Sequence, residues 1–321
     1  MNNPWNTIET PAHEFNVRLV SDKHPLRLYW GKDVRGGYLF IAQIALDVAP
    51  DKKSLPELAG IRVAVAKARD CARLVLLLNE TGNWEIFKAL CVDLIRASEV
   101  ATNDVSATAI IIKRLMQWHE FLKRERMHVL PPEAVKGLIG ELLFLENKLA
   151  PRFGWDFAVS FWKGPADAPQ DFAVHDTAVE VKYQSGVSKP YVQISSLEQM
   201  DTQLPRFYLV VYTLATAELD VPNGFTLNSL IERIQSALNT ANDVTRELFE
   251  SLIFQAGYVQ LDSYDEPNFH CVATRTFHVV DGFPRMTVAS VPEGVTKASY
   301  HISLDACASF ECNLDFNREE Q

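Results

Sequence analysis

The sequence predicts a mixed protein of the α+β or α/β class, built from two domains that span residues 1–130 and 131–321. A chain of 321 residues with 47% hydrophobic residues is long enough to bury two cores. Apolar residues at strand spacing and at helix spacing both occur along it, which predicts a mixed fold. Pro131-Pro132 interrupts the pattern, and we place the domain boundary there.

The N-terminal domain is expected to be a β-rich α+β unit. Apolar runs at 26–30 and 38–42 flank a polar loop that contains glycines, which predicts a β-hairpin. Further strands are expected at 61–65 and 72–78. Apolar residues at helical spacing predict helices over 84–97 and 106–126. The second helix carries a basic run near its end, which is typical of a solvated face and less often of a ridge that contacts DNA.

The C-terminal domain is expected to begin with a helix over 133–149. Short strands follow at 172–174 and 178–183, and a third contains Val192 and Ile194. The capping-box patterns Ser195…Glu198 and Ser196…Gln199 predict the start of a helix. A buried type of strand at 207–214, helices over 226–238 and 244–254, and β-structure at 271–280 and 298–304 complete this domain.

Composition excludes several classes of protein. The net charge of −10 argues against a broad non-specific grip on nucleic acid, although a local basic groove remains compatible with it. No apolar run reaches the roughly 20 residues of a membrane span, and the N-terminus lacks the pattern of a secretory signal. The five cysteines are scattered and show no metal-binding spacing. We therefore expect a cytoplasmic protein without a disulfide framework or a zinc site.

The candidate chemistry lies around a predicted hairpin with His175-Asp176 as its turn. In that register Asp171 lies opposite Glu180, with Cβ atoms roughly 4.5–5.5 Å apart. Lys182 shares the face of Glu180, because residues two apart in a strand point the same way. Two carboxylates and a lysine then converge at one edge of a sheet.

Two carboxylates this close repel each other unless a cation joins them. An oxygen-rich pair suits Mg²⁺, with Mn²⁺ as an alternative, and Lys182 would then orient a water or offset charge on a phosphate. A plain surface hairpin with an ion pair between Glu180 and Lys182 fits the same spacing. The neighbouring Glu141 lies on a helix that contains Gly137 and Gly140, which suggests a close approach to another backbone there. The solvated side of an amphipathic helix is the alternative for Glu141, and Trp162 is expected at the edge of the core.

These residues occur in an ordered set that resembles a known family. The set consists of Gly140-Glu141, Trp162…Gly164-Pro165, Asp171-Phe172, Glu180-Val181-Lys182 and 194–199. It resembles a bacterial family described as PD-(D/E)XK members, from the superfamily that includes restriction endonucleases, and that family is often associated with defence gene clusters. The resemblance implies a restriction-endonuclease-like core of helix, central mixed sheet and helix. It also implies that Asp171 and Glu180 bind metal, that Lys182 is catalytic and that Glu141 is an accessory acid. Gln170 stands where many members have proline, a departure that the superfamily tolerates.

Four other residues are candidates for DNA contact. Lys163 and Lys189 would contact phosphates, although lone lysines are usually solvated. Gln193 and Ser195 would share an exposed face, although Ser195 or Ser196 as a simple helix cap is the commoner role of such serines.

Taken together, the sequence predicts a Mg²⁺-dependent DNA endonuclease of restriction or phage-defence type that hydrolyses phosphodiester bonds with a metal-activated water. The alternative is a non-cleaving structural or DNA-binding subunit of a defence complex with a vestigial nuclease core, and a nuclease acting on RNA is a weaker option. Expected partners are DNA and either a second copy of the chain or other subunits of a defence system, without a membrane.

Overall fold

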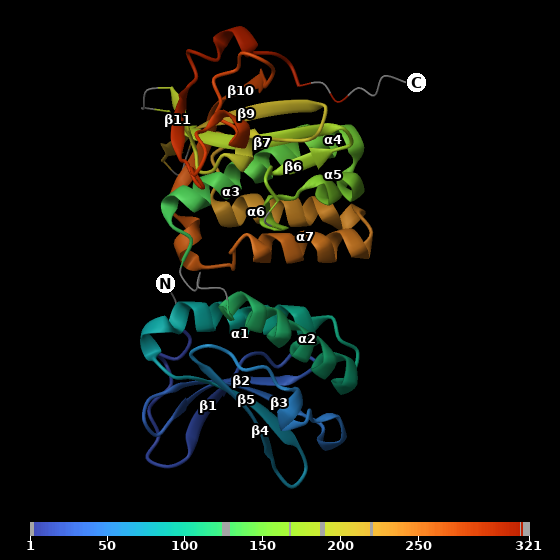
Figure 1. Ribbon diagram of the computed structural model, residues 1–321. Coiled ribbons are helices and arrows are strands. Elements are labelled where there is room, and N and C mark those ends of the chain that lie inside the picture. Colours follow the sequence, from blue (N-terminus) through green and yellow to red (C-terminus); the bar gives the residue numbers. More distant parts are fainter. Residues whose placement is uncertain are drawn as a thin grey trace. The chain divides into compact units, whose positions relative to one another are not determined.

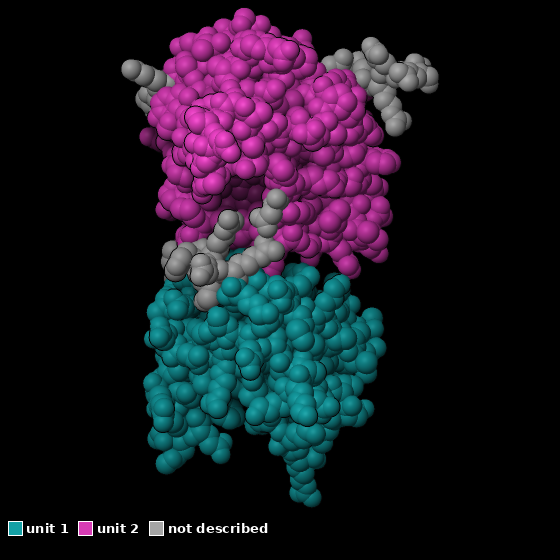
Figure 2. Space-filling model, in the orientation of Figure 1, with its two compact units in different colours: residues 1–128, 259–261 teal, residues 129–258, 262–321 magenta. Residues whose placement is uncertain are grey.

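The computed structural model describes residues 3–123, 129–166, 168–186, 190–218, 221–314 and 316, and its class is α+β, as predicted. The chain divides into two compact units (Figure 2). Unit 1 comprises residues 1–128 with 259–261, and unit 2 comprises 129–258 with 262–321. Independent folding of domains 1–130 and 131–321 stays a prediction.

Unit 1 is an antiparallel sheet with two helices on one face (Figure 1). The strand order is β1-β2-β3-β5-β4. The strands are β1 (Phe15–Leu19), β2 (Arg27–Asp33), β3 (Tyr38–Ile44), β4 (Ile61–Lys67) and β5 (Ala72–Leu78). The helices are α1 (Trp84–Glu99) and α2 (Asp104–Lys123). The predicted hairpin is β2 and β3, whereas β1 was not predicted because its side chains are mostly exposed and lack a clear alternation.

Trp5 joins three parts of unit 1. Its side chain is fully buried, and its indole N–H donates a 2.8 Å hydrogen bond to the Leu39 carbonyl. Its ring stacks on Tyr38 in β3 and on Phe87 in α1, with centroid distances of 4.8 Å and 5.2 Å. The N-terminal segment is thereby fixed to both the sheet and a helix.

Unit 2 is built on a mixed sheet of order β10-β9-β7-β6. Its strands are β6 (Phe172–Val174), β7 (Thr177–Ser185), β9 (Arg206–Ala217) and β10 (Asn268–His278). β7 runs parallel to β9, and the other two pairs are antiparallel. The helices are α3 (Pro132–Phe144), α4 (Ala150–Phe153), α5 (Trp155–Phe161), α6 (Leu227–Ala237) and α7 (Asp243–Gln255). A separate two-stranded sheet pairs β8 (Tyr191–Ile194) with β11 (Tyr300–Ser303).

The two faces of the mixed sheet are covered differently. Helix α3 lies on one face, where Gly140 approaches Val181 and Tyr212: a Cβ on this glycine would lie 3.4 Å and 3.9 Å from their side chains. On the other face, Ala178 belongs to a core cluster with Val192 and Ile302 of the β8–β11 sheet. The predicted close approach of another backbone is therefore not seen at Gly140, whose neighbours are side chains at ordinary van der Waals distance. Gly137 meets nothing within 4 Å.

Two predicted helices differ from the structure. The helix expected at Ser195 is a single 3₁₀ turn, Glu198–Met200. The Ser195 amide donates to the side chain of Gln199, and the backbone returns to an extended conformation at Asp201, so the capped turn never propagates. The helix expected over 133–149 ends as α3 at Phe144 and continues as a π-helical turn, Leu145–Leu149.

No helix in the described ranges combines the length and the apolar character that a membrane crossing requires.

We expect Trp5→Ala to lower the free energy of unfolding by about 3–5 kcal/mol, because the cavity and the lost stacking add to the lost hydrogen bond. Trp5→Phe keeps the stacking and should cost less. Phe157 in unit 2 is 62% exposed, so Phe157→Ala is a control that should stay within about 0.5 kcal/mol of the parent. Urea unfolding measures all three, and equal effects of the two alanine variants would contradict the assignment of Trp5 as an anchor.

Candidate active site

A tight hairpin brings Asp171 next to Glu180. The pairing of Val174 with Thr177 leaves His175 and Asp176 as a two-residue turn, as the sequence predicts. His175 has a φ of 53°, which a two-residue hairpin turn commonly requires. Phe172 pairs with Val179, so the register places Asp171 opposite Glu180, just beyond the end of β6.

Asp171 is fixed by three hydrogen bonds at the open side of β7. Its Oδ2 accepts a 2.7 Å bond from the Val181 amide, which has no strand partner on that side because β6 has ended. Its carbonyl accepts bonds from the amides of Lys163 and Gly164, at 2.7 Å and 2.9 Å. The loop that contains Trp162 and Gly164 is thereby held against the hairpin.

Glu141 reaches the same place from helix α3. Its Oε2 accepts a 2.7 Å hydrogen bond from the Trp162 indole N–H. A Cβ on Gly164 would lie 2.9 Å from this oxygen and 2.9 Å from Asp171 Oδ1. The two carboxylates therefore flank the space that the glycine leaves free.

Glu180 and Lys182 form an ion pair on the face of β7 opposite α3. Lys182 Nζ lies 2.6 Å from Glu180 Oε1, and the side chains are 15% and 0% exposed, respectively. Apart from this ion pair, neither carboxylate oxygen of Glu180 accepts a hydrogen bond from a described residue. The sequence predicted that these residues share a face, but it placed them at an exposed edge, whereas Glu180 is completely buried.

Burial dominates the protonation of this cluster. It raises the pKa of Glu180 to about 8, with the Asp171 charge acting in the same direction and Lys182 opposing both. Burial, and then the Asp171 charge, hold the pKa of Glu141 well above its usual range against the Trp162 hydrogen bond. The pKa of Asp171 is also raised by burial, although Lys182 and the Val181 amide oppose it. Burial alone would lower the pKa of Lys182, but the charges of Glu180 and Asp171 outweigh it and the pKa is raised.

Three carboxyl groups thus share one ammonium group, a set we call the acid cluster (Glu141, Asp171, Glu180 and Lys182). Fully ionised, it would carry two uncompensated negative charges in a poorly solvated place. Oxygen donors with excess negative charge suit a hard divalent cation such as Mg²⁺, which takes one or two carboxylates and keeps several waters. Within the described ranges, no three His, Cys, Asp or Glu side chains form a ready-made metal cage. The donor chemistry therefore fits an ion held by two carboxylates and water.

The remaining predicted site residues lie in different places. The backbone of Lys163 contacts Asp171, and its side chain is exposed. Gln193 and Ser195 are exposed on and after β8, where Gln193 Nε2 contacts Ser299 Oγ at 3.4 Å. No hydrogen bond or ion pair between described residues joins either one to the acid cluster. Lys189 lies outside the described residues.

Sequence reasoning missed two supporting residues. It assigned Trp162 to packing, and this residue is indeed 1% exposed, but its N–H also orients Glu141. It gave Gly164 no role, although the space beside the carboxylates depends on this glycine. The resemblance did include both residues, and their spacing from Asp171 was the available signal.

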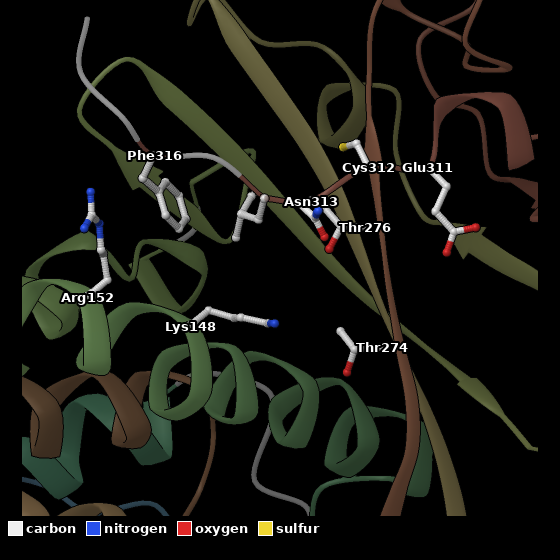
Figure 3. Close-up of a pocket in the computed structure, with 9 residues that line it drawn as sticks. Lys148, Arg152, Thr274, Thr276, Glu311, Cys312, Asn313 and Phe316 are labelled. Atoms are coloured by element: carbon white, nitrogen blue, oxygen red, sulfur yellow. The ribbon is translucent and has the colours of Figure 1, made fainter.

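A groove of about 740 Å³ lies away from these residues, against β10 (Figure 3). Lys148 and Thr274 line it from one side, and Glu311, Cys312, Asn313, Leu314 and Phe316 line it from the other. None of the residues that line it belongs to the acid cluster or to the other predicted site residues. This groove is thus separate from the candidate active site.

A family model described as "Putative PD-(D/E)XK family member, (DUF4420)" matches residues 1–305. No curated protein and no solved structure matches the chain.

We expect the stability of the metal-free protein to fall as the pH rises from about 4.5 to about 8. Between the ordinary pKa of a glutamate, 4.5, and the raised pKa of Glu180, about 8, the folded state binds more protons than the unfolded state. The slope is at most about 1.4 kcal/mol per pH unit for one such group. Glu180→Gln should flatten the profile, as measured by urea unfolding in EDTA. A profile that rises over this range, and is identical in the variant, would show that Glu180 is ionised throughout.

Gly164→Ala should weaken cation binding, because its methyl group would occupy the space between Glu141 and Asp171. Gly137→Ala is the matched control, since its surroundings are open and alanine favours a helix by about 1 kcal/mol. We expect Mn²⁺ to raise the melting temperature of the parent and of the control, and to raise that of Gly164→Ala much less. Equal shifts in all three proteins would place the ion elsewhere.

Proposed function

The chain belongs to this PD-(D/E)XK family, and from that membership we propose that it is a Mg²⁺-dependent DNA endonuclease of the restriction or phage-defence type. The family resemblance predicted from the sequence is confirmed by the match over residues 1–305. A nuclease-like function follows from membership in a PD-(D/E)XK family, whereas the metal, the DNA substrate and the defence role are parts of the proposal. The proposal also includes the predicted core of helix, mixed sheet and helix.

The observation that carries the proposal is the convergence of Glu141, Asp171, Glu180 and Lys182 at the open side of β7. These four side chains come from a helix, a loop and a strand within residues 132–185. Burial raises the pKa values of Glu141 and Glu180, and perturbed pKa values of this kind cluster at functional sites. A surface hairpin with an ordinary ion pair would not bury Glu180 completely.

In the proposed mechanism, Asp171 and Glu180 would hold the divalent cation. When bound, such an ion supplies Lewis acidity and lowers the pKa of a coordinated water. The Lys182 ammonium orients the attacking water and stabilises the negative charge that develops on the scissile phosphate. Glu141, held by Trp162, adds a further carboxylate that can accept a proton at its raised pKa.

Hydrolysis needs Glu180 to be ionised when the cation binds, and this sets a pH requirement. A divalent cation competes with the proton on a carboxyl group whose pKa is about 8. Cation binding should therefore tighten as the pH rises towards that value. The buried ion pair with Lys182 would then be replaced by a cation contact, which leaves the ammonium available to the substrate.

The complete burial of Glu180 also favours a second candidate function. This function is that of a non-cleaving structural or DNA-binding subunit of a defence complex, with a vestigial nuclease core. Such a core would keep a buried, charge-neutralised cluster for stability. The two functions differ in one measurable respect, since a vestigial core neither binds Mn²⁺ nor supports cleavage. Partner subunits, or a second copy of the chain, are proposed for either function.

Asp171→Asn and Lys182→Ala should each reduce Mg²⁺-dependent nicking of plasmid DNA by at least about 10²-fold, because they remove a cation ligand and a charge that stabilises the transition state. Asparagine keeps an oxygen acceptor for the Val181 amide, which avoids the cost of about 1–3 kcal/mol of leaving that buried donor unpaired.

Asp176→Asn is the matched control for this experiment. Asp176 lies in the turn of the same hairpin and pairs with Arg206, away from the acid cluster. It should retain full nicking activity. Undiminished activity in Asp171→Asn or Lys182→Ala would refute the mechanism, and no activity in the parent with Mg²⁺ or Mn²⁺ would favour the vestigial core.

A further inference from the structure

The charge of the chain is divided unevenly between its halves. Residues 1–128 contain 18 lysines and arginines against 15 aspartates and glutamates, whereas residues 129–321 contain 13 against 26. The net charge of −10 therefore conceals a slightly basic N-terminal half and a strongly acidic C-terminal half. Such asymmetry is a sequence indication of interaction with a polyanion.

In unit 2, much of the positive charge is already neutralised. Arg206, Arg233 and Arg275 form ion pairs with Asp176, Glu146 and Glu311, at 2.6 Å, 2.7 Å and 2.8 Å. Lys182 is paired within the acid cluster. If unit 2 alone bound a long polyanion through these side chains, their ion pairs would have to break.

Unit 1 presents a sheet face that the helices do not cover. Strand register places Leu19, Tyr29, Ile41, Val75 and Ala64 in one row on this face. The alternate residues, such as Trp30, Phe40 and Leu76, point to the opposite face, where α1 and α2 lie (Figure 1). We call the first of these the open sheet face and define it by Val17, Leu19, Arg27, Tyr29, Arg62 and Arg73.

Two neighbouring segments of unit 1 lie on the helix side of the sheet, whereas Leu39 and Ile41 in the middle of the open sheet face are 6% and 3% exposed. Arg18, which points away from Val17 and Leu19, bonds to Thr7 and to the Pro4 carbonyl of the N-terminal segment. The Glu57 carbonyl in the connection between β3 and β4 contacts His119 of α2. Both segments are therefore fixed on the helix side.

The open sheet face carries three arginines without carboxylate partners. Arg27 and Arg62 are exposed and Arg73 is half-buried, and none of them forms an ion pair with a described residue. Arg27 and Arg73 lie in one row, separated by Gln43 of β3. Arg62 pairs with Leu77, four residues along β5 from Arg73. At the usual strand spacings the Cα atoms of these three arginines lie about 10–20 Å apart.

Apolar and aromatic side chains of the edge strand β1 lie beside these arginines. Val17 and Leu19 are 43% and 41% exposed in the edge strand β1, although valine and leucine are usually buried. The Arg73 guanidinium lies 5.7 Å from the ring centroid of Phe15 at the start of β1. Because β1 and β5 are separated by two strands, this contact requires the open sheet face to be concave.

We propose that the open sheet face of unit 1 binds duplex DNA, with Arg27, Arg62 and Arg73 on its phosphates and the apolar side chains against its sugars. The identity of the polyanion as DNA rests on the proposed function. Arginine suits this role because its planar guanidinium binds phosphate with two hydrogen bonds and is weakly hydrated. Unit 1 thereby supplies the positive charge that the acidic unit 2 lacks.

The test is the binding of a fluorescein-labelled 30-base-pair duplex to the full chain in EDTA, measured by anisotropy at several salt concentrations. The variant Arg27→Gln/Arg62→Gln/Arg73→Gln should bind at least about tenfold more weakly, with a salt slope smaller by up to about 0.9 for each arginine removed. The control Lys52→Gln/Lys53→Gln/Lys123→Gln removes the same charge outside the open sheet face and should bind nearly as the parent does. If the triple arginine variant does not fold, as judged by circular dichroism, Arg62→Gln alone should still reduce the slope.

The outcomes separate this inference from the proposed function. Unchanged binding by the arginine variant overturns the inference, even where the parent cleaves DNA. Arginine-dependent binding by a parent that never cleaves supports the inference while the proposed endonuclease fails. Loss of a dimer in the arginine variant, with DNA binding unchanged, would show that this face contacts the acidic unit of a second copy, and it would also overturn the inference.

Discussion

The arrangement of unit 2 depends on one electrostatic constraint, which is that three carboxyl groups share a single ammonium group where water cannot solvate them. The elements around the cluster each stabilise one of these carboxyl groups. The early end of β6 frees the Val181 amide for Asp171, and Trp162 donates to Glu141. Lys182 neutralises the fully buried Glu180. The remaining negative charge is reduced by protonation of the carboxyl groups. A divalent cation that binds the cluster would displace these protons.

This constraint also explains why glycine and aromatic residues gather around polar chemistry. Gly140 packs against Val181 and Tyr212 on the sheet, and Gly164 leaves the space between two carboxylates. Trp162 packs in the core while its polar nitrogen faces the cluster. These residues contribute no charge, but the position of every charged group depends on them.

Sequence periodicity was sufficient for the α+β class, for the β6–β7 hairpin and for the shared face of Glu180 and Lys182, because these follow from local spacing and turn chemistry. Periodicity did not predict that Glu180 is completely buried. The same face of β7 packs, through Ala178, against the β8–β11 sheet, a pairing between segments more than 100 residues apart that no local pattern indicates. It was also wrong about the helix at Ser195, where the capping pattern was present but the chain turned away after one turn. The open sheet face went unnoticed because its arginines come from three strands and converge only through their register.

The hydrogen bond between Asp171 and the Val181 amide has a consequence for the solubility of the protein. Beyond Val179, β7 has no ladder partner on the β6 side, which leaves a strip of backbone donors and acceptors of the kind that recruits strands from other molecules. The Asp171 carboxylate accepts a hydrogen bond from the first of these donors, and the Asp171 backbone carbonyl holds the loop of Lys163 and Gly164 alongside it. The Asp171 side chain thus blocks the amide that an incoming strand would pair with first. Its removal would expose this backbone donor whether or not the acid cluster is catalytic.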